Sequence, residues 1–186
     1  GLVGSEMCIR DSYDMGKLYF SDYDGPLKGR AAYAMDYFSV AIGENTSFDK
    51  KEIAECYYSI CKFMTNQSKT SEHSLADYQA LFREIESAMA TVERSTDNEA
   101  NYDKISLYYV TMLLINDQAE YMAGVGFDKQ EASDLLQTLY TKSTSITSTL
   151  SYVTELQDKI KANYSSFVDN LNAKYNEVEK RQNGGN

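Results

Sequence analysis

An all-α fold is predicted by three features of the sequence. Apolar residues recur at steps of three and four along successive stretches, which is the spacing of one face of an α-helix. The 186 residues contain one proline, fewer than the many turns of a sheet protein require. Short polar segments separate the periodic stretches. We therefore expect about seven helices in antiparallel pairs, arranged as a short α-solenoid and followed by a long C-terminal helix.

The stretch from residue 13 to residue 43 predicts the first helix pair. The segment 22–26 interrupts the helical spacing, and Gly25-Pro26 is a strong turn signal because proline cannot continue the preceding helix. Gly43 stands where a glycine commonly closes a helix. The apolar or small positions are Tyr13, Gly16, Tyr19 and Phe20 in the first helix and Tyr33, Ala34, Tyr37, Phe38, Ala41 and Ile42 in the second.

Three further helices are predicted over about residues 49–66, 73–95 and 100–123. Asp49 with Glu52 has the D-x-x-E form of a capping box at the start of the first of them. The third is apolar nearly all round between residues 105 and 115, so we expect it to be the buried central helix. The expected inward positions of the other two are Ile53, Tyr57, Ile60, Cys61, Met64, Leu75, Tyr78, Phe82, Ile85, Met89 and Val92.

A helix over about residues 129–142 is predicted by a second D-x-x-E start, at Asp128 and Glu131. The serine- and threonine-rich residues 141–149 then predict a break, because these side chains compete for backbone hydrogen bonds. We expect a helical domain over residues 13–145, a long helix over residues 146–182 and a frayed tail at residues 183–186.

The long C-terminal helix has two alternative roles. Its apolar steps average between the period of a straight helix and that of a coiled coil. The helix either lies along the stack as a cap, or its outer half pairs with a second copy in a homodimer. Its apolar stripe is Ile146, Leu150, Val153, Leu156, Ile160, Tyr164, Phe167, Leu171, Tyr175 and Val178.

Residues 1–12, GLVGSEMCIRDS, differ from the rest of the chain and do not begin with methionine. They resemble translated sequencing-adapter tails, so we expect a non-native tail that does not contribute to the fold. The alternative is a genuine disordered N-terminus. On the first interpretation, Arg10 and Ser12 have no native role, and removing the tail leaves the melting temperature nearly unchanged.

The first helix pair resembles the tetratricopeptide repeat in the pattern Gly16-x-x-Tyr19 followed by Ala34-x-x-x-Phe38-x-x-Ala41. Small residues allow two helices to approach, and aromatic side chains fill the space beside them. The turn is about six residues longer than in the usual repeat, and Ser12 occupies the tryptophan position. The residues expected to pack the pair and its neighbour are Gly16, Tyr19, Ala34, Phe38, Ala41 and Cys61.

Residues 13–140 also resemble a wider family. They are similar to the tyrosine-rich, tetratricopeptide-like region that follows the kinase domain in some clostridial eukaryote-like serine/threonine kinases. The resemblance implies a protein-interaction role in a longer bacterial signalling protein. The helix at residues 49–66 aligns with the first helix at an offset longer than the usual repeat of about 34 residues, so the repeats are degenerate.

This alignment brings a second pattern into register. Tyr13-x-x-x-Lys17 matches Tyr58-x-x-x-Lys62, at positions that face the concave groove in tetratricopeptide stacks. Two tyrosines and two lysines there would hold an extended peptide with an acidic group, with tyrosine supplying apolar area and a hydroxyl. The alternative is that these four residues belong to an ordinary solvated helix face.

Catalytic and metal chemistry is not indicated by the sequence. His73 is the only histidine, so no histidine pair exists for a zinc or catalytic site. Cys56 and Cys61 are spaced to point to different faces of one helix, and we expect two free thiols, which favour the reducing cytoplasm. We expect no catalytic residue, no metal ligand and no cofactor.

Charge and hydropathy restrict the class of partner. The net charge is −10, which disfavours binding to the phosphate backbone of a nucleic acid. No apolar run approaches the roughly 20 residues that span a bilayer. The first functional hypothesis is therefore a non-catalytic module that binds a protein or peptide, in the cytoplasm or as part of a membrane-anchored protein. The alternative is a structural, self-associating helical protein, and an enzyme is the least favoured hypothesis.

Overall fold

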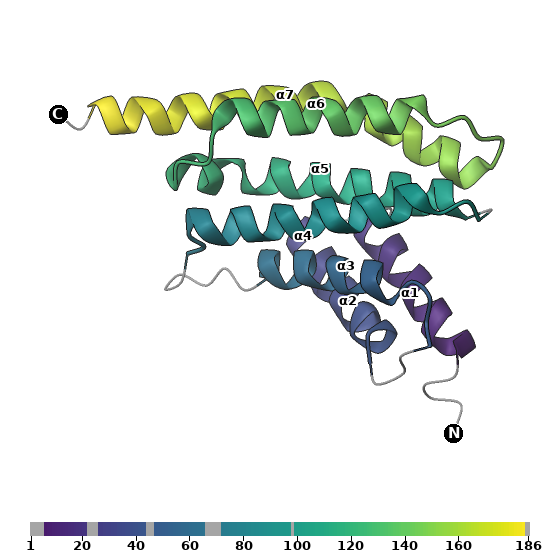
Figure 1. Cartoon of the computed structure of the whole chain (residues 1–186). Helices are drawn as coiled ribbons and strands as arrows, with labels where there is room; N and C mark the ends of the chain where they lie inside the picture. The colour runs from purple at the N-terminus through teal and green to yellow at the C-terminus, as the bar shows by residue number, and fades with distance from the viewer. Residues whose placement is uncertain (1–5, 22–25, 44–46, 66–71, 98, 185–186) are drawn as a thin grey trace. The chain divides into compact units, whose positions relative to one another are not determined.

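The predicted all-α fold is confirmed. Within the residues that a computed structural model describes, the chain forms helices α1 to α7 and no strand (Figure 1). The expected turn at Gly25, the connection at residues 44–46 and the loop at residues 66–71 lie outside these residues. The described ranges are 6–21, 26–43, 47–65, 72–97 and 99–184.

The helices follow one another with short connections. Their bounds are α1 (Glu6–Ser21), α2 (Leu27–Ala41), α3 (Lys51–Thr65), α4 (Leu75–Arg94), α5 (Ala100–Gly124), α6 (Lys129–Ser145) and α7 (Ser151–Gly184). They group into two compact units. The N-terminal unit takes its described residues from 1–72 and 81–94, and the C-terminal unit from 73–80 and 95–186. The helix α4 therefore contributes residues to both units.

The N-terminal unit is built from antiparallel neighbours. The helix α2 packs against α1 and α3. The Ser59 hydroxyl of α3 donates to Glu84 of α4 at 2.7 Å, and the Thr91 hydroxyl of α4 donates to Glu52 of α3 at 3.2 Å. Because the residue number rises along α3 as it falls along α4, these two helices run in opposite directions.

The first helix begins inside the segment expected to be a non-native tail. The helix α1 starts at Glu6, and Ile9 is 2% exposed. The Arg10 guanidinium pairs with the Asp49 carboxylate at 3.3 Å and lies 5.9 Å from the centre of the Phe48 ring. Residues 9 and 10 thus belong to the packed N-terminal unit, which differs from the expectation that residues 1–12 do not contribute to the fold.

Deleting residues 1–12 is therefore expected to destabilise the protein. The deletion removes the buried Ile9 side chain and the Arg10–Asp49 ion pair. Burial of one isoleucine is worth about 2 kcal/mol, whereas an exposed ion pair adds little. Differential scanning calorimetry of the two chains would measure the change. An unchanged melting temperature would contradict the packing of Ile9 and support the tail interpretation.

The C-terminal unit is organised around α5. From Ile105 to Ile115 every residue of α5 is buried, as expected from a segment that is apolar nearly all round. The helices α6 and α7 both pack against α5, and also against each other (Figure 1). The buried positions of α7 are Val153, Leu156, Gln157, Ile160, Phe167, Leu171, Tyr175 and Val178.

Polar contacts show that α5 and α7 run in the same direction. The Asn163 amide donates to the Tyr109 hydroxyl at 3.2 Å, and the Asn170 amide donates to the Asn116 carbonyl at 2.9 Å. Both bonds span 54 residues of sequence, and the second lies one heptad after the first. Over these residues, α7 therefore packs against α5 of the same chain, and pairing with a second copy stays a prediction.

The far end of α7 is held by the turn after α5. The Tyr175 hydroxyl donates to the Phe127 carbonyl at 2.8 Å. Burial, with the nearby Asp128 and Glu131 carboxylates, raises the pKa of this phenol well above its ordinary value. The hydroxyl therefore remains a hydrogen-bond donor at neutral pH.

The predicted break between the last two helices is present. The helix α6 ends at Ser145 and α7 begins at Ser151, so Ile146 and Leu150 precede α7 instead of opening its stripe. The Gln157 amide crosses back from α7 and donates to the carbonyls of Ser143 and Ile146, at 3.0 and 2.6 Å. These bonds satisfy carbonyl groups that a helix end leaves without an intrahelical partner.

Two of the helix starts contain capping interactions. The Asp128 carboxylate accepts from the Glu131 amide at 2.9 Å, as its spacing predicts. Ser74 and Asp77 form a reciprocal pair, because each side-chain oxygen accepts from the other residue's backbone amide. The capping box expected at Asp49 is replaced by a different arrangement. The helix α3 begins later, at Lys51, and the Asp49 carboxylate pairs with Arg10.

Candidate functional site

Tyr13, one of the four residues expected to line a groove, lies in the core of the N-terminal unit. Its side chain is 2% exposed. Its ring centre is 5.5 Å from that of Phe48, 6.2 Å from that of Tyr57 and 6.3 Å from that of Phe38, with edge-to-face geometry in each case. Such pairs stabilise an apolar core beyond the area they bury. Tyr13 thus helps to hold α1 against α2 and α3 and is not displayed on a peptide-binding face.

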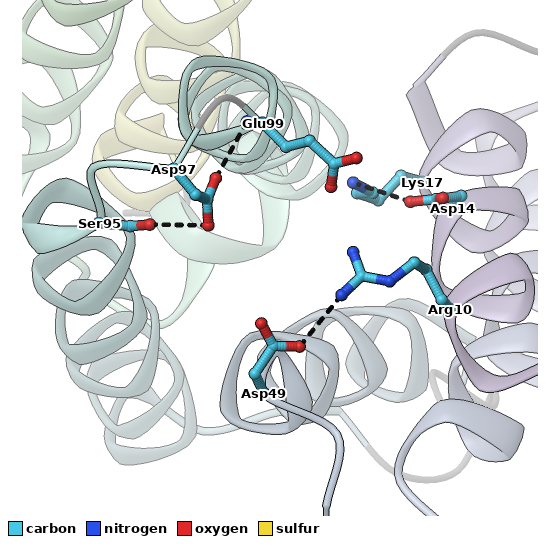
Figure 2. A network of polar contacts seen from close by, with 7 residues as sticks. All are labelled: Arg10, Asp14, Lys17, Asp49, Ser95, Asp97 and Glu99. Atoms are coloured by element: carbon cyan, nitrogen blue, oxygen red, sulfur yellow. Dashed lines mark hydrogen bonds and ion pairs between the residues drawn. The ribbon is translucent and has the colours of Figure 1, made fainter. Parts of the chain in front are cut away.

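Lys17 is also buried. Its ammonium group lies 4.2 Å from the centre of the Tyr13 ring and 3.4 Å from the Asp14 carboxylate on the same helix. Figure 2 shows the Lys17–Asp14 contact beside the Arg10–Asp49 ion pair. A cation over an aromatic face is attracted by the ring quadrupole, and a carboxylate one turn away adds a second favourable term. The Lys17 ammonium group therefore interacts with groups of its own chain.

Tyr58 and Lys62, the other two expected groove residues, lie on α3 in a different environment. Tyr58 is half-buried and Lys62 is exposed. The neighbouring Tyr57 is the α3 side chain that reaches Tyr13. The four residues therefore do not form one exposed cluster, because two are buried and two are at or near the surface.

The expected packing residues bring α1, α2 and α3 into close contact. A Cβ atom at Gly16 would lie 2.7 Å from the Phe38 ring, so only glycine leaves room for that ring in its present position. Phe38 in turn stacks on Tyr57, with ring centres 4.9 Å apart and an angle of 6° between the planes. Ala34, Ala41 and Cys61 are buried beside these rings.

Tyr19, the remaining packing candidate, belongs to an exposed cluster of three tyrosines. Its ring stacks on that of Tyr37 at 5.3 Å and on that of Tyr33 at 5.9 Å. Tyr33 is 64% exposed, and Tyr19 and Tyr37 are half-buried. We call these three residues the tyrosine face. Three more apolar side chains of the same two helices are exposed: Met15, Leu18 and Val40.

The hydroxyl groups of the tyrosine face interact as well as the rings. A hydrogen bond with Tyr37 raises the pKa of the Tyr19 phenol above its ordinary value, and the proximity of the second phenol acts in the same direction. The Tyr19 phenol is therefore neutral at physiological pH. The two hydroxyl groups offer a partner polar atoms next to stacked aromatic surface.

The two thiols described by the structure are not candidates for chemistry. Cys56 and Cys61 are free and buried, as their spacing predicts. Burial raises the pKa of both thiols, and for Cys56 the Glu84 and Glu52 carboxylates contribute further. The thiol and not the reactive thiolate is therefore present at neutral pH.

His73 is held near a helix start. Its Nδ1 atom lies 4.0 Å from the Asp77 carboxylate, and its ring meets that of Tyr78 edge-on at 6.0 Å. Hydrogen bonds from Ser74, first its backbone amide and then its hydroxyl, lower the pKa of Asp77. These contacts belong to the reciprocal cap of α4, and His73 is half-buried.

Metal ligation and membrane insertion have no candidate among the described residues. Within them, no three histidine, cysteine, aspartate or glutamate side chains gather in a way that could hold a metal ion. None of the helices in the described ranges is both long enough and apolar enough to cross a membrane. The tyrosine face is the candidate site of the N-terminal unit, because it combines stacked rings with an exposed Tyr33.

Comparisons with known proteins add no relative. No protein-family model, curated protein or solved structure matches the chain.

Proposed function

We propose that this chain is a non-catalytic protein-interaction module in the cytoplasm and that it forms the C-terminal part of a longer bacterial signalling protein. The observation that carries the proposal is the tyrosine face. Isolated apolar side chains are common on protein surfaces, but here three tyrosines stack on one another, and Met15, Leu18 and Val40 of the same two helices are exposed as well.

Tyrosine suits this role for physical reasons. Its ring provides a large contact area, its hydroxyl bonds to polar groups of a partner, and it is enriched where proteins bind one another. Stacking on Tyr19 restricts the rings of Tyr33 and Tyr37 before any partner arrives. Side chains that are ordered beforehand lose less conformational entropy on binding.

The arrangement of the C-terminal unit is compatible with a helical-repeat scaffold. Three consecutive helices pack together, and the first and third of them, α5 and α7, run in the same direction. Stacked helical hairpins have this arrangement, and extended binding surfaces are characteristic of them. This feature supports a tetratricopeptide-like scaffold for the proposed module.

Peptide selection tests the interaction role directly. A random peptide library displayed on phage would be selected on the protein, and the affinities of the enriched peptides would be measured for two variants. Tyr33→Ser removes the most exposed ring of the tyrosine face, and Tyr121→Ser removes an exposed ring of α5 as the matched control. We expect Tyr33→Ser to weaken binding by roughly tenfold or more and Tyr121→Ser to leave it unchanged.

Two results would overturn this role. One is a set of selected peptides that bind Tyr33→Ser as tightly as the original protein. The other is the absence of any enriched peptide over several rounds of selection. Circular dichroism of Tyr33→Ser checks that the helices are retained, which the exposure of this side chain leads us to expect.

The signalling context has a separate test. The resemblance to regions that follow kinase domains predicts a reading frame that continues upstream of residue 13 into a kinase domain with its lysine, HRD and DFG elements. Long-read sequencing of the genomic locus would reveal this frame. A start codon at residue 1, or an upstream frame with none of these elements, would remove the kinase association but leave the interaction role to the peptide experiment.

A further inference from the structure

Tyr140 of α6 and Tyr164 of α7, both in the C-terminal unit, form a close aromatic stack. Their ring centres are 4.0 Å apart, and the angle between the planes is 12°. The stacked rings of Tyr19 and Tyr37, by comparison, are 5.3 Å apart. Both Tyr140 and Tyr164 are half-buried, so part of each side chain is accessible to solvent.

We propose that Tyr140 and Tyr164 are a site of oxidative modification, at which a one-electron oxidant such as a haem peroxidase with hydrogen peroxide joins them in an intramolecular dityrosine. Each phenol loses one electron and one proton to give a phenoxyl radical. The two radicals form one carbon–carbon bond between ring positions ortho to the hydroxyls. The bonded carbons then lose their two protons while the two oxygens take up two protons, and both phenols reform. The two electrons and two protons removed overall reduce one peroxide to two waters.

Geometry favours this pair over an intermolecular reaction. Two rings held in contact have an effective concentration far above that of two separate chains in dilute solution. The near-parallel planes hold the two rings face to face, and rotations of the two side chains would bring one ortho carbon of each ring together. Burial raises the pKa of the Tyr164 phenol, and the nearby Tyr140 acts in the same direction, so Tyr164 begins as the neutral phenol, which loses a proton together with its electron.

The crosslink would join the two helices across the break between them. The covalent bridge would close the loop that includes the end of α6 at Ser145 and the start of α7 at Ser151. Because the crosslink also closes this loop in the unfolded chain, it lowers the conformational entropy of the unfolded state, as a disulfide does. By that analogy, we expect the melting temperature of the crosslinked monomer to rise by roughly 10 °C.

The sequence makes the product unambiguous to detect. Trypsin releases Tyr140 in peptide 130–142 and Tyr164 in peptide 162–174, and each peptide contains a single tyrosine. The full chain, kept dilute, would be treated with peroxidase and limiting peroxide, and the monomer would be isolated by size exclusion. We expect dityrosine fluorescence, a mass lower by two hydrogen atoms, and these two peptides joined in tandem mass spectra.

Three variants define the outcome. Tyr140→Phe and Tyr164→Phe each retain a stacked ring but remove a phenol, and each should abolish the joined peptides and the rise in melting temperature. Tyr121→Phe removes an exposed phenol from α5 and should leave both unchanged. The proposal is overturned if the monomer contains no dityrosine under conditions that dimerise free tyrosine. It is equally overturned if the principal link joins other residues, such as the edge-to-face pair Tyr102 and Tyr152.

Discussion

Replacing Gly16 with leucine is expected to reduce the free energy of unfolding by about 3 kcal/mol. Even the first added carbon would lie 2.7 Å from Cε1 and 2.8 Å from Cζ of Phe38, well inside van der Waals contact. The Phe38 ring has no free space to move into, because it is fully buried and stacked on Tyr57. The substitution must therefore separate α1 from α2 or break the aromatic core.

A smaller substitution makes the same test more discriminating. Alanine improves helix propensity over glycine by about 1 kcal/mol, so Gly16→Ala should be destabilising only if the clash with Phe38 outweighs this gain. Gly29 in α2 is the matched control, because no atom lies within 4 Å of the position its Cβ would take. Gly29→Ala should be neutral or stabilising, by up to about 1 kcal/mol. Equal stability of the two alanine variants in urea denaturation would contradict the close approach at Gly16.

The second large effect is expected at the centre of α5. Leu114→Ala should reduce the free energy of unfolding by about 3–4 kcal/mol, because Leu114 is fully buried and its removal leaves a cavity. Tyr121→Ala on the same helix is the control, since its side chain is 46% exposed, and we expect a change within about 0.5 kcal/mol. Urea unfolding followed by circular dichroism measures both. A loss below about 1 kcal/mol for Leu114→Ala would mean that α5 is not a packed central helix.

The central position of α5 was predictable from sequence for a simple reason. A helix that is apolar on every side must be buried on several sides, whatever its neighbours are. The prediction does not depend on which face of the helix points inward, so an error in choosing that face cannot arise. The buried run from Ile105 to Ile115 therefore follows from composition alone.

The environment of Tyr13 was not predicted, and the cause was the phase of α1. With residues 1–12 set aside, the inward stripe through Ile9, Tyr13 and Phe20 lost its first member. The repeat alignment instead assigns Tyr13 and Lys17 to a groove. The residue type alone does not indicate whether a tyrosine is buried or exposed, because its ring is stable in a core and its hydroxyl is stable at a surface.

The tyrosine face and the partner of α7 illustrate what one-dimensional patterns omit. The spacing of Tyr33 and Tyr37 places them on one side of α2, but their stacking on Tyr19 depends on how α1 and α2 pair. Similarly, the near-heptad spacing of α7 predicts that the helix has a partner helix. It does not say whether that partner is α5 of the same chain or a second copy.

The shared helix α4 has a consequence for folding during synthesis. The N-terminal unit takes its last residues from 81–94, after the chain has contributed residues 73–80 to the other unit. The α3 side chains that bond to Glu84 and Thr91 therefore wait for the second half of α4 to leave the ribosome. Until Arg94 emerges, the α3 surface that these bonds join to α4 stays uncovered, and a translational pause before that point would favour capture by a chaperone or aggregation.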